Sequence, residues 1–318
     1  GTARDQSGFT SQTLTEHWNG STWNIVSSPN PSSAQNVLVN AAALTTSDVW
    51  AVGQTGNSNG TAFQTLVEQW NGKQWNVISS PNTSLPFNFL NGVAIVSAND
   101  IWAVGVAETA GEASSQTLIE HWNGSQWSII ASPDPGTPFN ELRSVTAVST
   151  SNVWAVGDYE TSSGTQTLVE HWNGSQWKVV TSQNPSLGNF LSGVDALAAN
   201  NIWAVGFTAD SNGFSKTLTE HWDGKTWQVV ASPNPDQDFN GLSSVSAASA
   251  NNIWAVGSQS LSSKTLIEHW NGTQWQVVAS PNRSGVSNIL QSVAVVPSTS
   301  KVWTLGYSGS STLTEFYC

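Results

Sequence analysis

The chain has 318 residues, of which 38% are hydrophobic and 9% are charged, whereas charged residues make up about 25% of a typical soluble domain. The formal net charge is −12 and the pI is about 4.6. Binding to nucleic acid or to an anionic membrane surface requires clustered lysine and arginine, so the composition argues against both kinds of partner. No apolar run reaches the roughly 18 residues of a transmembrane helix. The sequence begins with Gly1 and contains neither methionine nor a recognisable signal peptide, which we interpret as a mature chain whose leader has been removed.

The most informative feature of the sequence is an internal repeat with a period of 48 to 52 residues. One repeated phrase is "TLTEHWNGSTWNIV" at 13–26, and the other resembles "DVWAVG" around Trp50. All 18 tryptophans fall within these two phrases. The first phrase returns at 65–78, 117–130, 167–180, 217–230 and 265–278, and the second is centred on Trp50, Trp102, Trp154, Trp203, Trp254 and Trp303.

Each repeat predicts four short strands, with the patterns "LxxVxAxS", "VWAVG", "TLVEHW" and "WxVVxS". All four are rich in β-branched and aromatic residues and are bounded by turn residues. An Asn-Gly or Asp-Gly pair joins the third strand to the fourth, which is a strong hairpin signal. Four antiparallel strands repeated about every 50 residues are typical of a β-propeller. We therefore predict an all-β fold, a six-bladed β-propeller with four antiparallel strands per blade, as a single domain over residues 1–318.

In chain order, residues 10–28 are predicted to supply strands three and four of a closing blade. Residues 37–280 supply five full blades, and residues 289–317 supply strands one to three of the closing blade. The closing blade is thus predicted to be built from both chain ends. This assignment gives one strand more than six four-stranded blades require, because both ends carry a copy of the third strand.

The predicted turns divide into two classes, and one class is the better candidate for recognition. The turns between strands one and two and between strands three and four are short and repetitive, whereas the other two are long and varied, as in "AETAGEASSQ" at 107–116. Variable loops on a regular scaffold commonly carry binding. An asparagine closes each turn that leads into a first strand, and we expect its side chain to brace that turn by bonding to backbone. These residues are Asn36, Asn88, Asn140, Asn189, Asn240 and Asn288.

The histidines and many of the glutamates recur at one position each of the third strand, so they are spread over the repeats. A metal centre or a general base needs such groups gathered in one place, and a glycosidase needs one close pair of carboxylates. We therefore expect structural roles, no catalytic residue, no metal site and no cofactor. The residues are His17, His121, His171, His221 and His269, together with Glu16, Glu68, Glu120, Glu170, Glu220, Glu268 and Glu315.

Five phenylalanines of the long turns are the candidates for ligand binding. Aromatic rings at loop positions stack on sugars in some proteins, and in others they pin a loop onto the strands beneath it; both interpretations remain open. The candidates are Phe87, Phe89, Phe139, Phe190 and Phe239.

The repeated phrases "EHWNGSQW" and "NVWAVG", with "SPNP" in several repeats, resemble the tryptophan-rich repeats of secreted bacterial propeller proteins. The resemblance covers nearly the whole chain and implies an extracellular or cell-surface setting and a propeller fold, but no activity. In architecture alone the chain also resembles kelch-type and tectonin-type propellers, whose sugar-binding motifs it does not match residue for residue.

The preferred functional hypothesis is a non-enzymatic structural or adhesive module that assembles with copies of itself into fibres through the surplus terminal strand. An unpaired strand edge is a template for another chain, and head-to-tail exchange gives an open filament. The alternative is a multivalent lectin that binds glycans, and a glycosidase or lyase ranks third. We expect neither nucleic acid nor membrane insertion. The assembly residues of this hypothesis are Thr13, Leu14, Trp18, Thr312, Leu313, Phe316 and Cys318, the last being either a free thiol or a link to another chain.

Overall fold

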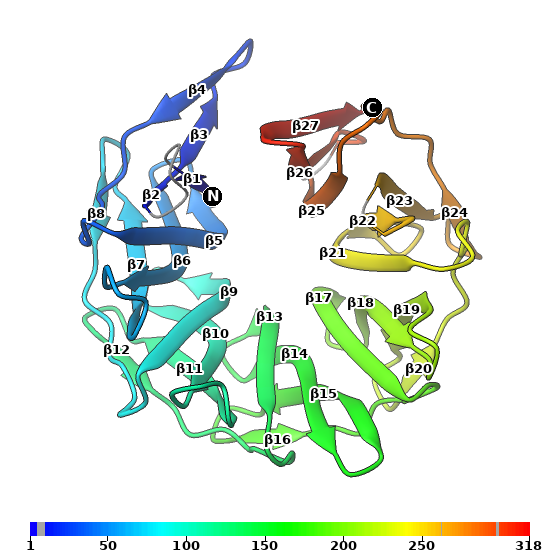
Figure 1. Cartoon of the computed structure of the whole chain (residues 1–318), viewed down its shortest axis with the longest axis horizontal. Coiled ribbons are helices and arrows are strands. Elements are labelled where there is room, and N and C mark those ends of the chain that lie inside the picture. The colour runs from blue at the N-terminus through cyan, green and yellow to red at the C-terminus, as the bar shows by residue number, and fades with distance from the viewer. Residues whose placement is uncertain (5–9, 262, 297–298) are drawn as a thin grey trace. The chain divides into compact units, whose positions relative to one another are not determined.

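The computed structural model describes residues 1–4, 10–261, 263–296 and 299–318. Every regular element in these ranges is a β-strand (Figure 1). In this part of the chain there is no helix with the length and apolarity needed to cross a membrane. The chain forms two compact units: the first comprises Gly1–Ser151 with Asn173–Lys178, and the second comprises Asn152–Trp172 with Val179–Cys318.

The first unit contains two antiparallel sheets of four strands, β5 to β8 and β9 to β12, whose strands follow one another in chain order. A single parallel bridge between Phe63 and Phe87 joins the two sheets, and β3 and β4 form a separate hairpin. The strands are β1 (Thr2–Arg4), β2 (Ser11–Thr13), β3 (Thr15–Trp18), β4 (Trp23–Val26), β5 (Gln35–Thr45), β6 (Asp48–Gly56), β7 (Phe63–Trp70), β8 (Trp75–Val77), β9 (Phe87–Ser97), β10 (Asp100–Glu108), β11 (Ser115–Trp122), β12 (Trp127–Ile129) and β13 (Asn140–Ser149).

The second unit repeats the pattern in the sheets β17 to β20 and β21 to β24, preceded by the pair β14 and β15 and followed by the three-stranded sheet β25 to β27. The strands are β14 (Asn152–Thr161), β15 (Gly164–Trp172), β17 (Gly188–Ala198), β18 (Asn201–Ala209), β19 (Ser215–Trp222), β20 (Trp227–Val229), β21 (Asn240–Ser249), β22 (Asn252–Gln259), β23 (Lys264–Trp270), β24 (Trp275–Val277), β25 (Asn288–Val295), β26 (Val302–Ser308) and β27 (Ser311–Tyr317), while β16 (Trp177–Val179) is shared between the two units.

The Asn-Gly turns predicted between the third and fourth strands are confirmed. In the hairpin of β11 and β12, the Asn123 side-chain oxygen accepts the main-chain N–H groups of Ser125 and Gln126 at 3.0 and 3.1 Å. Gly124 follows with φ +93°, a left-handed conformation that costs glycine little. The asparagine therefore closes the turn with its own side chain, and the next strand begins at once.

The glycine of "VWAVG" is required for a steric reason. The first and second strands of each repeat shift register at this point, and the backbones approach closely. A β-carbon on Gly206 would overlap the carbonyl oxygen of Phe190, and one on Gly257 would overlap that of Gly241. Only glycine fits a backbone approach of this kind.

Tryptophans from successive repeats pack on one another. In the first unit the Trp50 ring lies 5.1 Å from Trp122 and 5.7 Å from Trp127, in tilted and edge-on arrangements that favour aromatic pairs. Around these rings lie the buried aliphatic residues of both sheets. Equivalent contacts in the second unit join Trp154 to Trp222 and Trp227, and Trp203 to Trp270 and Trp275.

The structure differs from the prediction at residues 10–28, where the third strand is divided at Leu14. Ser11–Thr13 (β2) pairs with β1 and, in parallel, with the start of β5, while Thr15–Trp18 (β3) pairs with β4. The amide of Leu14 donates to the carbonyl oxygen of Gly1 at 3.0 Å. The short strand β1 thus stands beside β2 where the other repeats have their second strand.

Candidate functional site

Buried glutamates recur at one position of the third strand in successive described repeats. Some of them accept hydrogen bonds from serines of the segment that follows the preceding repeat: Ser28 donates to Glu68 at 2.6 Å, and Ser182 donates to Glu220 at 2.7 Å. Ser280 bonds Glu315 at 2.9 Å in the same way. These contacts confirm the predicted structural role. The members with no exposed surface are Glu68, Glu120, Glu170, Glu220 and Glu268.

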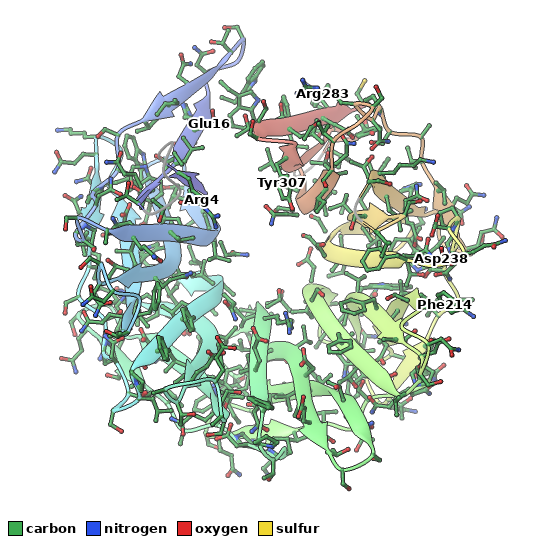
Figure 2. All side chains as sticks on the ribbon, in the orientation of Figure 1. Arg4, Glu16, Phe214, Asp238, Arg283 and Tyr307 are labelled. Carbon is green, nitrogen blue, oxygen red and sulfur yellow. The ribbon has the colours of Figure 1, made fainter. Side chains whose placement is uncertain are left out.

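Glu16 departs from this pattern. It occupies the repeat position of the buried glutamates, yet its side chain is exposed on β3 (Figure 2). Glu315 occupies the same repeat position on β27 and is buried. The two copies of the third-strand phrase are therefore not equivalent in the folded chain, because the one at 312–317 holds the repeat contact and the one at 13–18 does not.

Burial keeps the glutamates protonated to unusually high pH. It raises the pKa of Glu220 to about 7, although Ser182 and the main-chain N–H of Gln183 oppose the shift. It raises the pKa of Glu268 to about 8, and neither carboxyl oxygen of Glu268 has a hydrogen-bond partner among the described residues. The pKa of Glu68 rises to about 7 and that of Glu120 to about 8, also through burial. Desolvation disfavours the charged form unless donors or cations compensate for it.

The third-strand histidines belong to a second repeated arrangement. His121 Nε2 lies 2.8 Å from Asp100 Oδ1, the Trp102 indole donates to the same oxygen at 3.0 Å, and the two rings pack 4.2 Å apart. Other repeats have asparagine in place of Asp100, and there burial lowers the pKa of the histidine. The structural role predicted for His121, His171, His221 and His269 is confirmed, whereas His17 is exposed on β3 and lies outside this arrangement. The equivalent sets are Trp154, Asn152 and His171; Trp203, Asn201 and His221; and Trp254, Asn252 and His269.

The asparagine braces are also confirmed. Asn240 accepts the N–H of Asp236 at 3.0 Å and donates to the Asp236 carbonyl oxygen at 2.7 Å. Asn36, Asn88, Asn140, Asn189 and Asn288 make equivalent bonds in their own turns. Among the described residues, no three His, Cys, Asp or Glu side chains are grouped so as to hold a metal ion.

The candidate phenylalanines form local clusters with partners that the sequence analysis missed. Phe87 and Phe89 lie with Phe63, whose ring centre is 6.0 and 5.4 Å from theirs. Phe190 stacks on Phe207 at 4.6 Å across β17 and β18. The rings are only partly exposed, so they hold the starts of strands together and leave a limited surface for a ligand. Phe139 and Phe239 are partly buried at the ends of their turns.

The predicted assembly residues divide between two places. In the first unit, Thr13 lies in β2, Leu14 at the break and Trp18 in β3 against Trp23. In the second unit, Thr312, Leu313 and Phe316 lie in β27, and Phe316 packs on Trp303 at 4.8 Å. Cys318 is an exposed free thiol.

The sheet β25 to β27 exposes a face that every other repeat buries. Leu305 of β26 is 38% exposed. In the other repeats a valine takes its position and is completely buried: Val205 and Val256, for example, lie in clusters with residues of the next sheet. The valines equivalent to Leu305 are Val52, Val104, Val156, Val205 and Val256, all 0% exposed.

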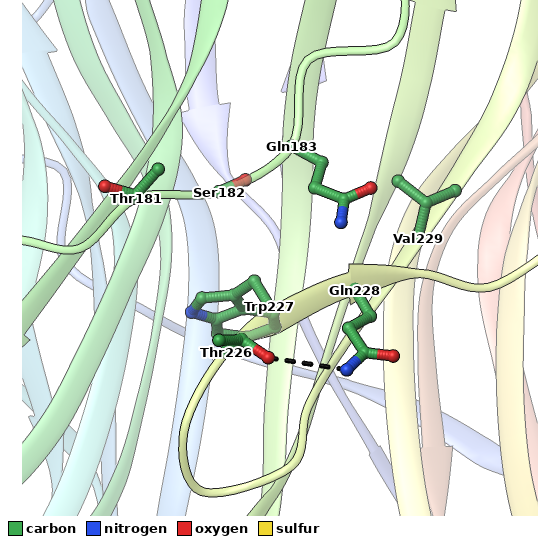
Figure 3. A pocket seen from close by; sticks show the side chains of 7 residues that line it. All are labelled: Thr181, Ser182, Gln183, Thr226, Trp227, Gln228 and Val229. Carbon is green, nitrogen blue, oxygen red and sulfur yellow. Dashed lines mark hydrogen bonds between the residues drawn. The ribbon is translucent and has the colours of Figure 1, made fainter.

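The second unit also contains a polar groove, shown in Figure 3, with a volume of about 480 Å³. One wall is the segment 181–183, and the other is the fourth strand β20 with the residue before it. None of the lining side chains is charged. They are Thr181, Ser182, Gln183, Thr226, Trp227, Gln228 and Val229.

Sequence reasoning did not single out this groove, although a signal was present. Gln183 stands where the other repeats have proline after the serine, at Pro29, Pro81, Pro133, Pro233 and Pro281. Proline has neither an N–H nor a polar side chain, whereas the side chain of Gln183 carries an amide with two donors and an acceptor. A comparison of the repeats position by position finds this departure.

No protein-family model and no curated protein sequence matches the chain. Among solved structures it is similar to YCF48 bound to a D1 peptide, with a TM-score of 0.52 and 14% identity over 85% of this chain and 74% of that one. It is similar to the fucose-specific lectin from Aleuria aurantia, with a TM-score of 0.52 and 14% identity over 88% of this chain and 92% of the lectin. It is also similar to a Trypanosoma rangeli sialidase in complex with difluorosialic acid, with a TM-score of 0.58 and 14% identity over 99% of this chain but 57% of the sialidase. At these identities the likeness shows the fold alone, and that fold is a β-propeller built here from tryptophan-rich repeats.

Proposed function

We propose that this chain is a non-enzymatic, extracellular structural or adhesive protein, a six-bladed β-propeller that joins copies of itself into fibres. The closing blade combines residues 289–317 of one chain with residues 10–28 of the next. The observation that carries this proposal is the exposed face of β25 to β27, where Leu305 is 38% exposed although its counterparts in the other repeats are fully buried.

The repeat itself indicates what covers such a face. In each sheet of the second unit that is followed by another, the valine equivalent to Leu305 packs on the first and second strands of the next repeat. The first strand of the first full repeat, β5, exposes Ala41, whereas the equivalent Val245 and Val293 are buried. A surface like that of β5 therefore fits β25 to β27, and in the proposed fibre a second copy supplies it, with the hydrophobic gain of burying matched apolar faces.

Glu16 supports the same proposal, because it lies within residues 10–28, the segment that would complete the blade of another copy. The glutamates at its repeat position in the other copies are buried, and Glu68, Glu220 and Glu315 also bond a serine of the preceding repeat, whereas Glu16 is exposed. The hairpin β3 and β4 thus carries third and fourth strands without the usual first and second strands beside them.

The non-enzymatic part of the proposal rests on where the reactive side chains lie. Glu68 and Glu220 bond serines, and four of the histidines share asparagine or aspartate oxygens with tryptophans. These contacts recur from repeat to repeat, so they serve the fold. Catalysis needs instead one distinct group of acid, base or nucleophile.

A multivalent lectin is the second candidate, and the partly exposed cluster of Phe63, Phe87 and Phe89 favours it. A glycan array tests this candidate directly. Binding that is lost in the Phe87→Ala/Phe89→Ala double variant supports it, and an array without hits counts against it.

Multi-angle light scattering of Leu305→Gln tests the assembly. This variant places an amide on the face that a second copy would bury, so the mass of the assembly should fall toward that of the monomer. Val277→Gln is the matched control, because Val277 is an exposed aliphatic residue on the outer strand β24, and its assembly should be unchanged. Equal masses for wild type and Leu305→Gln would contradict the proposal.

A further inference from the structure

The groove between residues 181–183 and β20 differs from the equivalent regions of the other repeats by one residue that changes its chemistry. Gln183 replaces the proline found in the five other copies, and its side chain is exposed at the groove (Figure 3). The side-chain amide has no hydrogen-bond partner among the described residues. An amide with two donors and an acceptor is thus available on one wall.

The backbone beneath this amide is firmly held. The hydroxyl of Ser182, the residue before Gln183, donates to the carboxylate of Glu220 at 2.7 Å, and Glu220 is completely buried. This bond to a buried group holds the segment in place. A ligand therefore meets a pre-positioned wall and does not have to order it, which reduces the free-energy cost of binding.

The opposite wall adds polar groups from side chains and backbone. The Gln228 amide makes only long contacts of 3.4 Å with Thr226 and Asp223, so it can turn toward a ligand. In the ladder of β19 and β20, Val230 donates to Thr219 and Asp223 donates to Thr226. This alternation places the main-chain N–H and C=O groups of Trp227 and Val229 on the unpaired edge of β20.

We propose that this groove is a binding site for a neutral saccharide, with one or two sugar rings held by Gln183 and Gln228. Sugar hydroxyls bond the two amides and the hydroxyls of Thr181 and Thr226, and an apolar sugar face rests on the exposed part of Val229. The volume of about 480 Å³ lies in the range of small-molecule pockets.

Charge and strand length favour a neutral saccharide over other ligands. The groove has no charged lining residue and the chain carries a net charge of −12, so an anion is disfavoured. The strand β20 has only 3 residues, which is too short a ladder to hold an added peptide strand by backbone bonds. Glutamine occupies this repeat position only at Gln183, and the proposed site depends neither on assembly nor on the loop phenylalanines.

The test is an NMR titration of the side-chain amide signals of Gln183 and Gln228. The probes are the methyl glycosides of glucose, galactose, mannose, N-acetylglucosamine and fucose, each added to the full chain. At least one glycoside should shift both signals, with a Kd on the order of 1 mM because the groove is open and no charged contact contributes. If none of the glycosides shifts the signals, the proposal is overturned.

Four variants test whether binding depends on Gln183. Gln183→Ala leaves the bond between Ser182 and Glu220 in place and removes only the amide, and it should weaken binding about tenfold or more. Gln183→Pro restores the residue of the other repeats and should do the same. Gln276→Ala is the matched control, because Gln276 follows the tryptophan of β24 as Gln228 follows Trp227, and Pro233 is the repeat equivalent of Gln183 there; binding should be unchanged. An equal loss in Gln276→Ala would overturn the proposal, as would a loss confined to Phe87→Ala/Phe89→Ala.

Discussion

Ser182 donates a hydrogen bond of 2.7 Å to the carboxylate of Glu220, although 38 residues separate the two in the chain. The bond joins the end of one repeat to the third strand of the next. Equivalent bonds join Ser28 to Glu68 and Ser280 to Glu315. The glutamate of the "TLxEHW" phrase is therefore a link between neighbouring repeats, and its burial sets its protonation.

Stability should fall as the pH rises from about 5 to about 8. An unfolded glutamate ionises near pH 4.5, whereas the folded pKa is about 7 for Glu68 and Glu220 and about 8 for Glu120 and Glu268. The folded state binds more protons in that window, so raising the pH favours unfolding. Thermal unfolding followed across this range should show Tm decreasing with pH. Glu268→Gln, which cannot ionise, should flatten the decline, and a Tm that rises toward pH 8 would contradict the assignment.

Removal of the serine hydroxyl should weaken the link between repeats. Ser182→Ala leaves the buried carboxyl of Glu220 with fewer donors, and the free energy of unfolding should drop by about 1–3 kcal/mol. Urea denaturation measures the change. Ser162→Ala is the control, because Ser162 is exposed in a turn and makes no hydrogen bond among the described residues. Equal stability of the two variants would argue against the link.

The pKa of a third-strand histidine should depend on the residue whose side-chain oxygen the histidine shares with a tryptophan. Burial lowers the pKa of His221, which is bonded to Asn201 at 2.9 Å. Asn201→Asp recreates the pair seen between His121 and Asp100, and a carboxylate at this distance should raise the pKa of His221 by about one unit or more. NMR titration of the imidazole protons measures it. His269 keeps its asparagine partner and serves as the internal reference; an unchanged His221 pKa would refute the prediction.

The glycine of the second strand should not tolerate a side chain. In Gly206→Ala the new β-carbon would overlap the carbonyl oxygen of Phe190, and the free energy of unfolding should fall by roughly 3 kcal/mol or more. In Gly241→Ala the nearest atom to the new β-carbon would lie 3.6 Å away, so this buried glycine provides the control. Chemical denaturation measures the free energy of unfolding of both variants. Comparable losses of stability would show that the close approach is not the cause.

Features fixed by local chemistry could be predicted from the sequence. The Asn-Gly hairpins and the bracing role of Asn240 and its counterparts both follow from residue types that recur at one position. The repeat displays each of these residues several times, so a structural role could be distinguished from a catalytic one.

Features that depend on single departures from the repeat were missed. The strand β1 has 3 residues and pairs with β2, and no periodic pattern marks so short a segment. Phe63 and Phe207 complete aromatic clusters across strands, which a reading of the turns alone does not reveal. The groove depends on Gln183 replacing a proline, and its polar walls come from segments about 45 residues apart.

The central claim is that the exposed face of β25 to β27 is covered by a second copy of the chain. Sedimentation velocity of the unmodified protein, from low micromolar to millimolar concentration, measures this directly. The account predicts a sedimentation coefficient that grows with concentration as chains add head to tail. A single species of 33.8 kDa at every concentration would contradict it.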